Sequence, residues 1–166
     1  VDLITRKVGG RAWSTRHIMK IVVASDNHGD SDVLKRIVLA NQDASLFLHL
    51  GDSQMFDYEI SPFIGVKGNC DYGKDYPMEL YIDTPYGKLY MHHGNFLYGV
   101  TPELIKIKNC KIFLYGHIHR KRIQKFNDTY VVCPGSTSLP RGNDSASYLI
   151  IEFDKNNEPI FTFKEL

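Results

Sequence analysis

The chain has 166 residues, 43% of them hydrophobic, so it is long enough to bury one core and too short for two ordinary domains. Twenty Lys and Arg against nineteen Asp and Glu leave a formal charge of +1, which excludes a global field that would draw the protein to nucleic acid or to an anionic membrane. Its apolar runs have the length of strands and fall far short of the roughly 20 residues of a membrane-spanning helix. We therefore expect neither nucleic acid nor membrane among its partners.

The three cysteines, Cys70, Cys110 and Cys133, are an odd number with no C-x-x-C spacing. This pattern argues against a disulfide framework and for a reducing compartment. We therefore expect a cytoplasmic protein.

The first 18 residues differ from the rest, because they mix Arg, Lys, Gly, Ser and Thr without a strand or helix period. Met19 then opens the first convincing strand. We interpret residues 1–18 as a leader, either vector-derived or a disordered native extension, and residues 19–166 as a single domain. A transit peptide is the alternative, although Gly9-Gly10 would interrupt an amphipathic helix.

The first part of this domain alternates strand and helix patterns. Short apolar runs predict strands over residues 20–25 and 46–50, and residues 60–66 lead toward another. Between the first two, residues 30–41 repeat apolar side chains at helical spacing. The order predicts a parallel strand–helix–strand unit.

The second part is mostly β. A Pro/Gly turn at residues 84–87 separates two runs of β-formers, which predicts an antiparallel hairpin over residues 78–92. Thr101 as N-cap and Pro102 at the first helical position predict a short helix. Further strands are predicted over residues 111–115, 120–126, 129–133, 147–153 and 159–163. We expect an α/β (α+β) fold, a four-layer αββα sandwich of two mixed β-sheets flanked by helices.

Five short segments near predicted strand ends carry side chains that bind metals: Asp26-Asn27-His28, Gly51-Asp52, Gly68-Asn69, His93-Gly94 and Gly116-His117-Ile118-His119. Asp, Asn and imidazole suit Mn²⁺, Fe²⁺ or Zn²⁺ far better than Cu(I) or an iron–sulfur cluster. One shared carboxylate can bridge two ions about 3.5–4 Å apart. The segments therefore indicate a two-metal site, whose usual chemistry is phosphoester hydrolysis.

Each segment taken singly has a simpler explanation. Asp26 could cap a loop, Gly51-Asp52 could form a turn, and Asn69 could occupy a left-handed turn. Their joint occurrence at strand ends favours metal binding. If the strand that ends near residue 115 continues, His117 and His119 point to the same side, as ligands of adjacent ions require.

The order D-x-H, G-D, G-N, H-G and G-H-x-H resembles the calcineurin-like metallophosphoesterases. Small size, Gly68-Asn69-Cys70-Asp71, and Pro134-Gly135-Ser136 with Pro140-Arg141-Gly142 resemble their compact YfcE-type phosphodiesterase branch. The resemblance covers Met19 to the C-terminus. It implies a first ion held by Asp26, His28 and His119, a second held by Asn69, His93 and His117, and Asp52 as the bridge.

The same resemblance implies that Asp52, Asn69 and His93 act in catalysis through a hydroxide held between two divalent ions. Mn²⁺ is the first choice, with Fe, Zn, Ni or Mg as alternatives. Many related centres carry a His after the Gly-Asn pair as a candidate general acid, and this chain has Cys70 there. A thiol can donate a proton but replaces imidazole poorly, and Cys70 could instead be a small buried residue.

Several further side chains have two interpretations each. Tyr72, Tyr76, Phe96 and Tyr98 could wall a pocket or pin loops, and Arg120 and Arg141 could contact phosphate or only be solvated. We expect His49 to be half-buried and satisfied. We expect His92 to be exposed or to cap a loop.

The main prediction is a divalent-metal-dependent phosphodiesterase acting on a small-molecule phosphoester. A phosphomonoesterase or nucleotidase is the first alternative, since the metals would do the same chemistry. The second is a protein-interaction scaffold resembling the retromer subunit Vps29. The full ligand set favours an enzyme, and the oligomeric state stays open, a homodimer or a higher homo-oligomer included.

Overall fold

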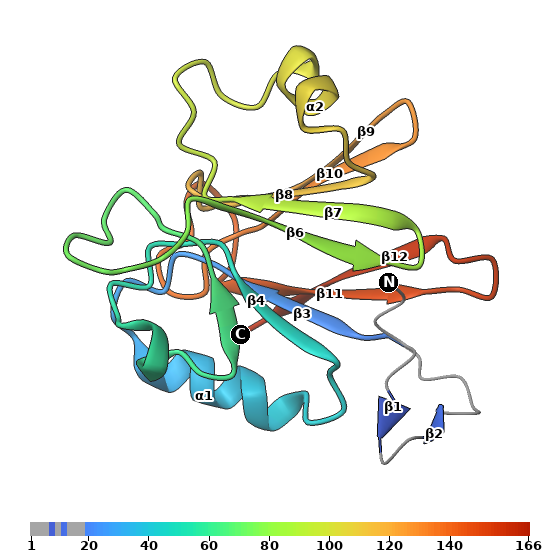
Figure 1. Ribbon diagram of the computed structural model, residues 1–166. Coiled ribbons are helices and arrows are strands. Elements are labelled where there is room, and N and C mark those ends of the chain that lie inside the picture. The colour runs from blue at the N-terminus through green and yellow to red at the C-terminus, as the bar shows by residue number, and fades with distance from the viewer. Residues whose placement is uncertain (1–6, 9–10, 13–18) are drawn as a thin grey trace.

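Two five-stranded mixed sheets form the centre of the fold in a computed structural model that describes residues 7–8, 11–12 and 19–166 (Figure 1). The first sheet has the order β12-β11-β3-β4-β5. Its strands are β3 (Ile21–Ala24), β4 (Leu46–His49), β5 (Phe63–Gly65), β11 (Ser147–Phe153) and β12 (Pro159–Glu165). The three strands β3, β4 and β5 run parallel, as predicted, and β11 pairs antiparallel with both β3 and β12.

The second sheet has the order β6-β7-β8-β10-β9. Its strands are β6 (Glu79–Thr84), β7 (Gly87–His92), β8 (Ile112–Tyr115), β9 (Lys121–Phe126) and β10 (Thr129–Pro134). The predicted hairpin is β6–β7, and β8 lies parallel to both β7 and β10. The short strand lengths follow the short apolar runs of the sequence.

One helix covers the outer face of each sheet, which gives four layers (Figure 1). Helix α1 (Ser31–Ala40) begins at Asp30, whose side chain accepts the N–H of Val33. Helix α2 (Pro102–Lys108) begins at Thr101, whose hydroxyl accepts the N–H of Leu104. A 3₁₀ turn, η1 (Asp57–Glu59), precedes β5. The predicted αββα sandwich and both predicted helix starts are therefore confirmed.

Alternation along the strands divides the buried side chains among the layers. In β3, Ile21 and Val23 lie in the core between the sheets, whereas Val22 packs in the cluster beneath α1. In β8, Leu114 lies between the sheets and Phe113 packs on the α2 side. The runs read as continuously apolar because both faces of each central strand are covered.

The predicted leader lies outside the described residues except for two short pieces. Lys7–Val8 (β1) and Arg11–Ala12 (β2) pair as antiparallel strands, where the sequence shows no strand period. No helix in the described part of the chain is long and apolar enough to cross a membrane.

Candidate metal centre

All seven predicted ligands lie in loops that follow strands, and both sheets contribute. Asp26 and His28 follow β3, Asp52 follows β4, Asn69 follows β5, His93 follows β7, and His117 and His119 follow β8. Five of the seven have a positive φ, between 45° and 74°: Asp26, His28, Asp52, His117 and His119. Such backbone is uncommon for residues other than glycine and clusters at functional sites. The candidate ligands therefore sit on tight turns at the strand ends.

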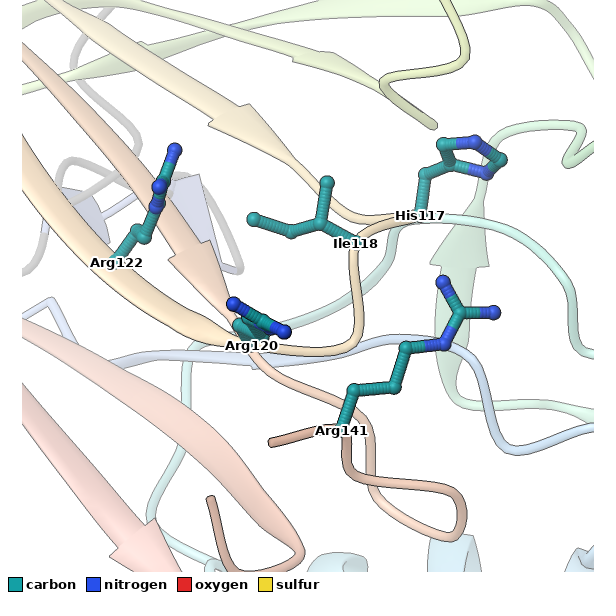
Figure 2. A pocket seen from close by; sticks show the side chains of 5 residues that line it. All are labelled: His117, Ile118, Arg120, Arg122 and Arg141. Atoms are coloured by element: carbon teal, nitrogen blue, oxygen red, sulfur yellow. The ribbon is translucent and has the colours of Figure 1, made fainter. Parts of the chain in front are cut away.

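The loop after β8 corrects one prediction. The strand does not continue past Tyr115, and Figure 2 shows His117 and Ile118 on the loop that leaves it. The N–H of Gly116 donates to the carbonyl of His93 and that of Ile118 donates to Gly116, which turns the chain. Strand alternation therefore does not direct His117 and His119, although both reach the cluster of ligands.

Two glycines allow these loops to meet. A Cβ at Gly68 would overlap the carboxylate and N–H of Asp52. A Cβ at Gly116 would overlap the Ser25 hydroxyl and the Asp26 carboxylate. Glycine is required at both positions because backbone passes directly over a ligand side chain.

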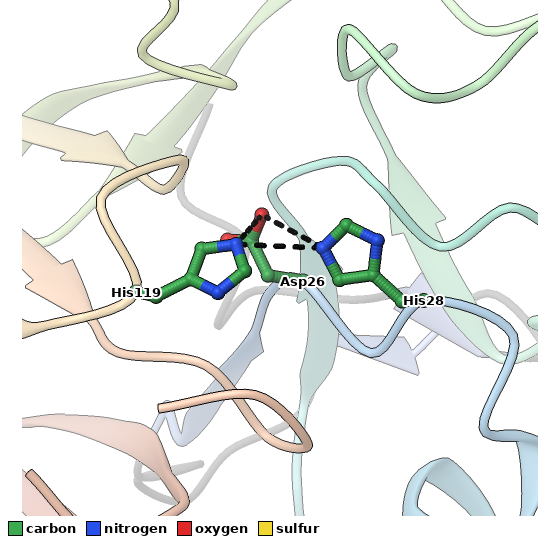
Figure 3. A group of neighbouring side chains, drawn as sticks. All are labelled: Asp26, His28 and His119. Carbon is green, nitrogen blue, oxygen red and sulfur yellow. Dashed lines mark hydrogen bonds and ion pairs between the residues drawn. The ribbon is translucent and has the colours of Figure 1, made fainter. Parts of the chain in front are cut away.

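The first ligand group consists of Asp26, His28 and His119 (Figure 3). Nε2 of His119 lies 3.3 Å from Oδ1 of Asp26, and Nε2 of His28 lies 3.9 Å from the same oxygen. The two Nε2 atoms are 3.4 Å apart. Three side chains from two sheets therefore aim one ligand atom each at a common point.

Hydrogen bonds on the far side of both rings fix which atoms face that point. Nδ1 of His28 is 2.8 Å from Oε1 of Gln54, and Nδ1 of His119 is 2.7 Å from the carbonyl oxygen of Leu139. Because these oxygens only accept, each Nδ1 carries the proton of its neutral ring, and each Nε2 presents a lone pair. Partners of this kind commonly orient metal-binding histidines.

One oxygen of the Asp26 carboxylate, Oδ1, faces the two Nε2 atoms, and no hydrogen-bond donor lies among these three acceptors. Its Oδ2 accepts from the Ser25 hydroxyl at 2.6 Å and from the N–H of His117 at 3.1 Å. Its Oδ1 is buried and has no hydrogen-bond partner among the described residues. An unpaired buried carboxylate oxygen facing two imidazole lone pairs fits a divalent cation, which would satisfy all three atoms.

The second ligand group surrounds Asp52. Its Oδ2 lies 3.3 Å from Nε2 of His93 and 3.9 Å from Nε2 of His28. Oδ1 of Asn69 lies 2.9 Å from Nε2 of His93 and 3.1 Å from Nδ1 of His117. Asp52, His93 and His117 also offer ligand atoms within 4.8 Å of one another. Asp52 therefore lies between the two groups, where a bridging carboxylate would be placed.

Backbone contacts orient this second group as well. Oδ1 of Asp52 accepts the N–H of Cys70 at 2.7 Å, which leaves Oδ2 to face the histidines. Nδ1 of His93 donates to the carbonyl oxygen of Leu50 at 2.7 Å, so its Nε2 faces the carboxylate. The residues of both groups fit divalent ions by atom type and by orientation.

Mutual stabilisation of carboxylates and imidazoles shifts their pKa values. Burial acts to raise the pKa of Asp52, but His93 and the N–H of Cys70 outweigh it and lower the pKa to about 2. Burial also acts to raise the pKa of Asp26, but the neighbouring imidazoles of His119 and His93 and the hydroxyl of Ser25 outweigh it and lower the pKa. Burial acts to lower the pKa of His93, but Asp52 and Asp26 outweigh it and raise the pKa. A cation bound between these groups would favour the neutral form of His93, which is the form that binds metal.

Asp71 is a structural residue of the site to which the sequence reasoning assigned no role. Its Oδ2 accepts the N–H groups of Asp52 at 2.9 Å and Gly68 at 2.7 Å, and its Oδ1 accepts that of Gln54 at 2.8 Å. The side chain is 1% exposed. In the sequence, the indication of this role is that Asp71 lies two residues after the candidate ligand Asn69. Asp71 ties the loop that carries Asp52 to the loop that carries Asn69.

His49 and His92 hold turns in the same way on the two sheets. Each is the last residue of its strand, and each Nδ1 accepts the N–H of the glycine two residues on, Gly51 at 3.0 Å and Gly94 at 2.9 Å. Burial lowers the pKa of both rings to about 4, so both are neutral at pH 7. His49 is fully buried instead of half-buried, because Asn27 accepts from its other nitrogen. His92 caps a loop, one of its two predicted roles, and is buried.

Cys70 is partly exposed and faces the candidate centre, so the interpretation as a small buried residue is wrong. Its Sγ lies within 4.8 Å of ligand atoms of His28 and Asp52. Partial burial and the Asp52 carboxylate raise the pKa of the thiol, so it is protonated at neutral pH. It is placed there because its N–H binds Asp52.

The four aromatic residues separate into two kinds. Tyr76 is buried and its hydroxyl donates to the carbonyl of Met55, while Phe96 stacks on His92 with ring centres 4.0 Å apart. Both pin loops. Tyr72 and Tyr98 are 81% and 85% exposed, so neither packs into the core or pins a loop by burial.

Known proteins resemble the chain in both sequence and fold. It is 27% identical to the probable metallophosphoesterase YsnB of Bacillus subtilis, covering 83% of this chain and 86% of that protein. It is 26% identical to phosphodiesterase YfcE of Escherichia coli K12, covering 82% and 89%.

Among solved structures, a predicted phosphoesterase from Streptococcus pneumoniae superposes with a TM-score of 0.73 at 25% identity, covering 90% of this chain and all of that one. Vps29 from Cryptosporidium parvum superposes with a TM-score of 0.70 at 15% identity, covering 90% and 98%, which is a likeness of fold. The calcineurin-like phosphoesterase superfamily domain matches residues 19–156. The chain therefore belongs to the calcineurin-like phosphoesterase superfamily.

Proposed function

We propose that this chain is a divalent-metal-dependent phosphodiesterase that hydrolyses small-molecule phosphodiesters at a two-metal centre. In this proposal Asp26, His28 and His119 hold one ion, Asn69, His93 and His117 hold the other, and Asp52 bridges them. The observation that carries it is the unpaired Oδ1 of Asp26, buried against two imidazole lone pairs. The name of the relative YfcE supports diesters as the substrate class.

Two divalent ions bound here would lower the pKa of a shared water and neutralise charge on the phosphate oxygens. Asp26 and Asp52 bring only two negative charges, since neutral imidazoles and Asn69 make up the other ligands. The loaded site would therefore stay positive and attract an anionic diester. Hydrogen bonds to Gln54, Leu50 and Leu139 hold the rings of His28, His93 and His119, respectively, in their metal-facing orientation. These rings therefore need not reorient during the reaction.

Mn²⁺ is the ion we propose first, with Fe, Zn, Ni and Mg as alternatives, because a mixed set of carboxylate, amide and imidazole ligands suits Mn²⁺.

Two alternatives to a phosphodiesterase differ in how well the site fits them. Cleavage of monoesters would use the same groups. A scaffold like Vps29 shares the fold, but a scaffold does not need a cluster of hydrogen-bond acceptors, such as Oδ1 of Asp26 and the two Nε2 atoms, with no donor among them.

Metal removal tests the enzyme proposal directly. Chelation should abolish hydrolysis of bis(4-nitrophenyl) phosphate, and Mn²⁺ should restore it. The metal-free protein should also melt at a lower temperature, because an ion at 100 times its dissociation constant stabilises by about 2.7 kcal/mol. His119→Ala should weaken one ion and lower the rate, since it removes one imidazole from a loop position.

Metal content must be measured beside activity in this experiment. Protein shown to contain two ions that hydrolyses neither diesters nor 4-nitrophenyl phosphate above the level of His119→Ala would contradict the proposal. That result would favour the scaffold.

Cys70→Ser tests whether the thiol donates a proton to the leaving group. Ser keeps the size of the side chain and is a much weaker acid. We expect little change with bis(4-nitrophenyl) phosphate, whose leaving group needs no proton, and a loss of about 10²-fold or more with an alkyl ester. An equal loss with both esters would point to displacement of Asn69, the neighbouring residue. No loss with either ester would contradict the donor role.

A further inference from the structure

A pocket lined by three arginines adjoins the candidate metal centre at His117. It has a volume of about 340 Å³ and is lined by His117, Ile118, Arg120, Arg122 and Arg141. Figure 2 shows the guanidinium groups of Arg120 and Arg141 on either side of the loop that carries His117, with Arg122 farther along β9. This volume is at the small end of ligand pockets, which suits one compact group.

No carboxylate of the described residues pairs with the three guanidinium groups. The pocket lining contains no carboxylate, and none of the three arginines forms an ion pair with Asp or Glu among the described residues. The whole chain has a formal charge of only +1, so this concentration is local. Three cations around one hollow repel one another until an anion enters.

The three arginines are exposed, and contacts of their side chains or backbone place them around the pocket. Arg122 interacts with the hydroxyl of Tyr115, a buried residue of β8. The guanidinium of Arg120 packs over Gly142, where an added Cβ would lie 3.5 Å from its central carbon. The backbone N–H of Arg141 donates to the carbonyl of His119 at 3.0 Å. The loop of Arg141 is therefore joined to the segment that carries two candidate ligands.

We propose that this pocket binds a second phosphate of the substrate, next to the phosphate that is hydrolysed. Guanidinium groups match phosphate oxygens in pairs, and several can share one phosphate. His117 lies in both places, so a group in the pocket is adjacent to one at the metals. Ile118 offers apolar contact to the carbon atoms that join the two phosphates. The inference rests on the proposed function and narrows its substrate class to diesters that carry another phosphate.

The test compares two diesters that differ only in the second phosphate. Thymidine 5′-(4-nitrophenyl phosphate) and its 3′-phosphorylated form share the scissile bond and the leaving group. The Mn²⁺-loaded protein should prefer the phosphorylated form about tenfold or more in kcat/KM, mainly through KM, as expected for charged hydrogen bonds. In Arg141→Gln and Arg122→Gln the ratio of the two kcat/KM values should fall, and in the double variant it should approach one.

Arg36→Gln is the matched control, because it removes the same charge from the exposed face of α1 and should keep the preference. Added salt should reduce the preference of the wild type. If both esters are hydrolysed with equal kcat/KM, the pocket proposal is wrong and the phosphodiesterase proposal stands.

If neither ester is hydrolysed, calorimetry on the same protein still tests the pocket. Thymidine 3′,5′-bisphosphate should then bind about tenfold more tightly than thymidine 5′-monophosphate, and Arg141→Gln should remove the difference. Equal binding of the two nucleotides would overturn the inference.

Discussion

Asp52→Asn should lower phosphodiester hydrolysis by more than about 100-fold, the upper end of what loss of an outer-shell partner costs. The substitution keeps the size of the side chain and its acceptor for the N–H of Cys70. It replaces the charged Oδ2, which lies 3.3 Å from Nε2 of His93, with an uncharged donor. An N–H group there would occupy the lone pair of His93 and oppose two cations. Both ions should therefore bind more weakly.

Metal content by mass spectrometry, kcat/KM and the melting temperature should be measured on the same preparation. Asp75→Asn is the control, since that carboxylate is exposed and the charge change is identical. The control should keep two ions and the wild-type rate. If Asp52→Asn also keeps two ions and a normal rate, Asp52 is not the bridge.

The fold could be predicted because its signals are local. Val22 and Val23 of β3 face different cores, and the apolar run that contains them is short enough to exclude a helix. Thr101 and Pro102 mark the start of α2 through contacts within one turn. The layers follow, since strands with two covered faces need helices outside the sheets.

The conformation of the ligand loops could not be predicted in the same way. His117 and His119 reach the centre through left-handed backbone, which hydrogen bonds to His93 and Asp26 support. The N–H of His117 and its acceptor on Asp26 are 91 residues apart in sequence. Strand alternation therefore does not explain how His117 and His119 come to face the other candidate ligands.

The roles of the residues that support the candidate ligands are even harder to predict from the sequence than the conformation of the loops, because they depend on contacts between distant segments. His49 binds Asn27 across 22 positions, and Asp71 binds Asp52 across 19. Ligand types can be recognised from the chemistry of metals, whereas a buried Asp or His that holds backbone looks like any other polar residue near a turn. The exposure of Cys70 likewise follows from its N–H binding Asp52 and not from its residue type.

Asp71→Asn should destabilise the metal-free protein by about 2–4 kcal/mol, because it breaks the contact between two ligand loops. The carboxylate accepts three N–H groups, from Asp52, Gly68 and Gln54. An amide has one acceptor oxygen, so its NH₂ group must face at least one of these donors. A buried N–H without an acceptor, next to another donor, is among the costly defects of a folded protein.

Urea unfolding in excess chelator measures this loss without a contribution from bound ions. Asp75→Asn, on an exposed side chain in the same loop region, should stay within about 0.5 kcal/mol of the wild type. Mn²⁺ affinity of the folded Asp71→Asn protein should fall about 10–100-fold, because Asp52 and Asn69 lose their fixed spacing. If unfolding is unchanged and only Mn²⁺ affinity falls, Asp71 acts on the ions and not as the tie between loops. If both are unchanged, the buried carboxylate has no role in forming the centre, and the Gly68 and Asp52 backbones must be held by the rest of the fold.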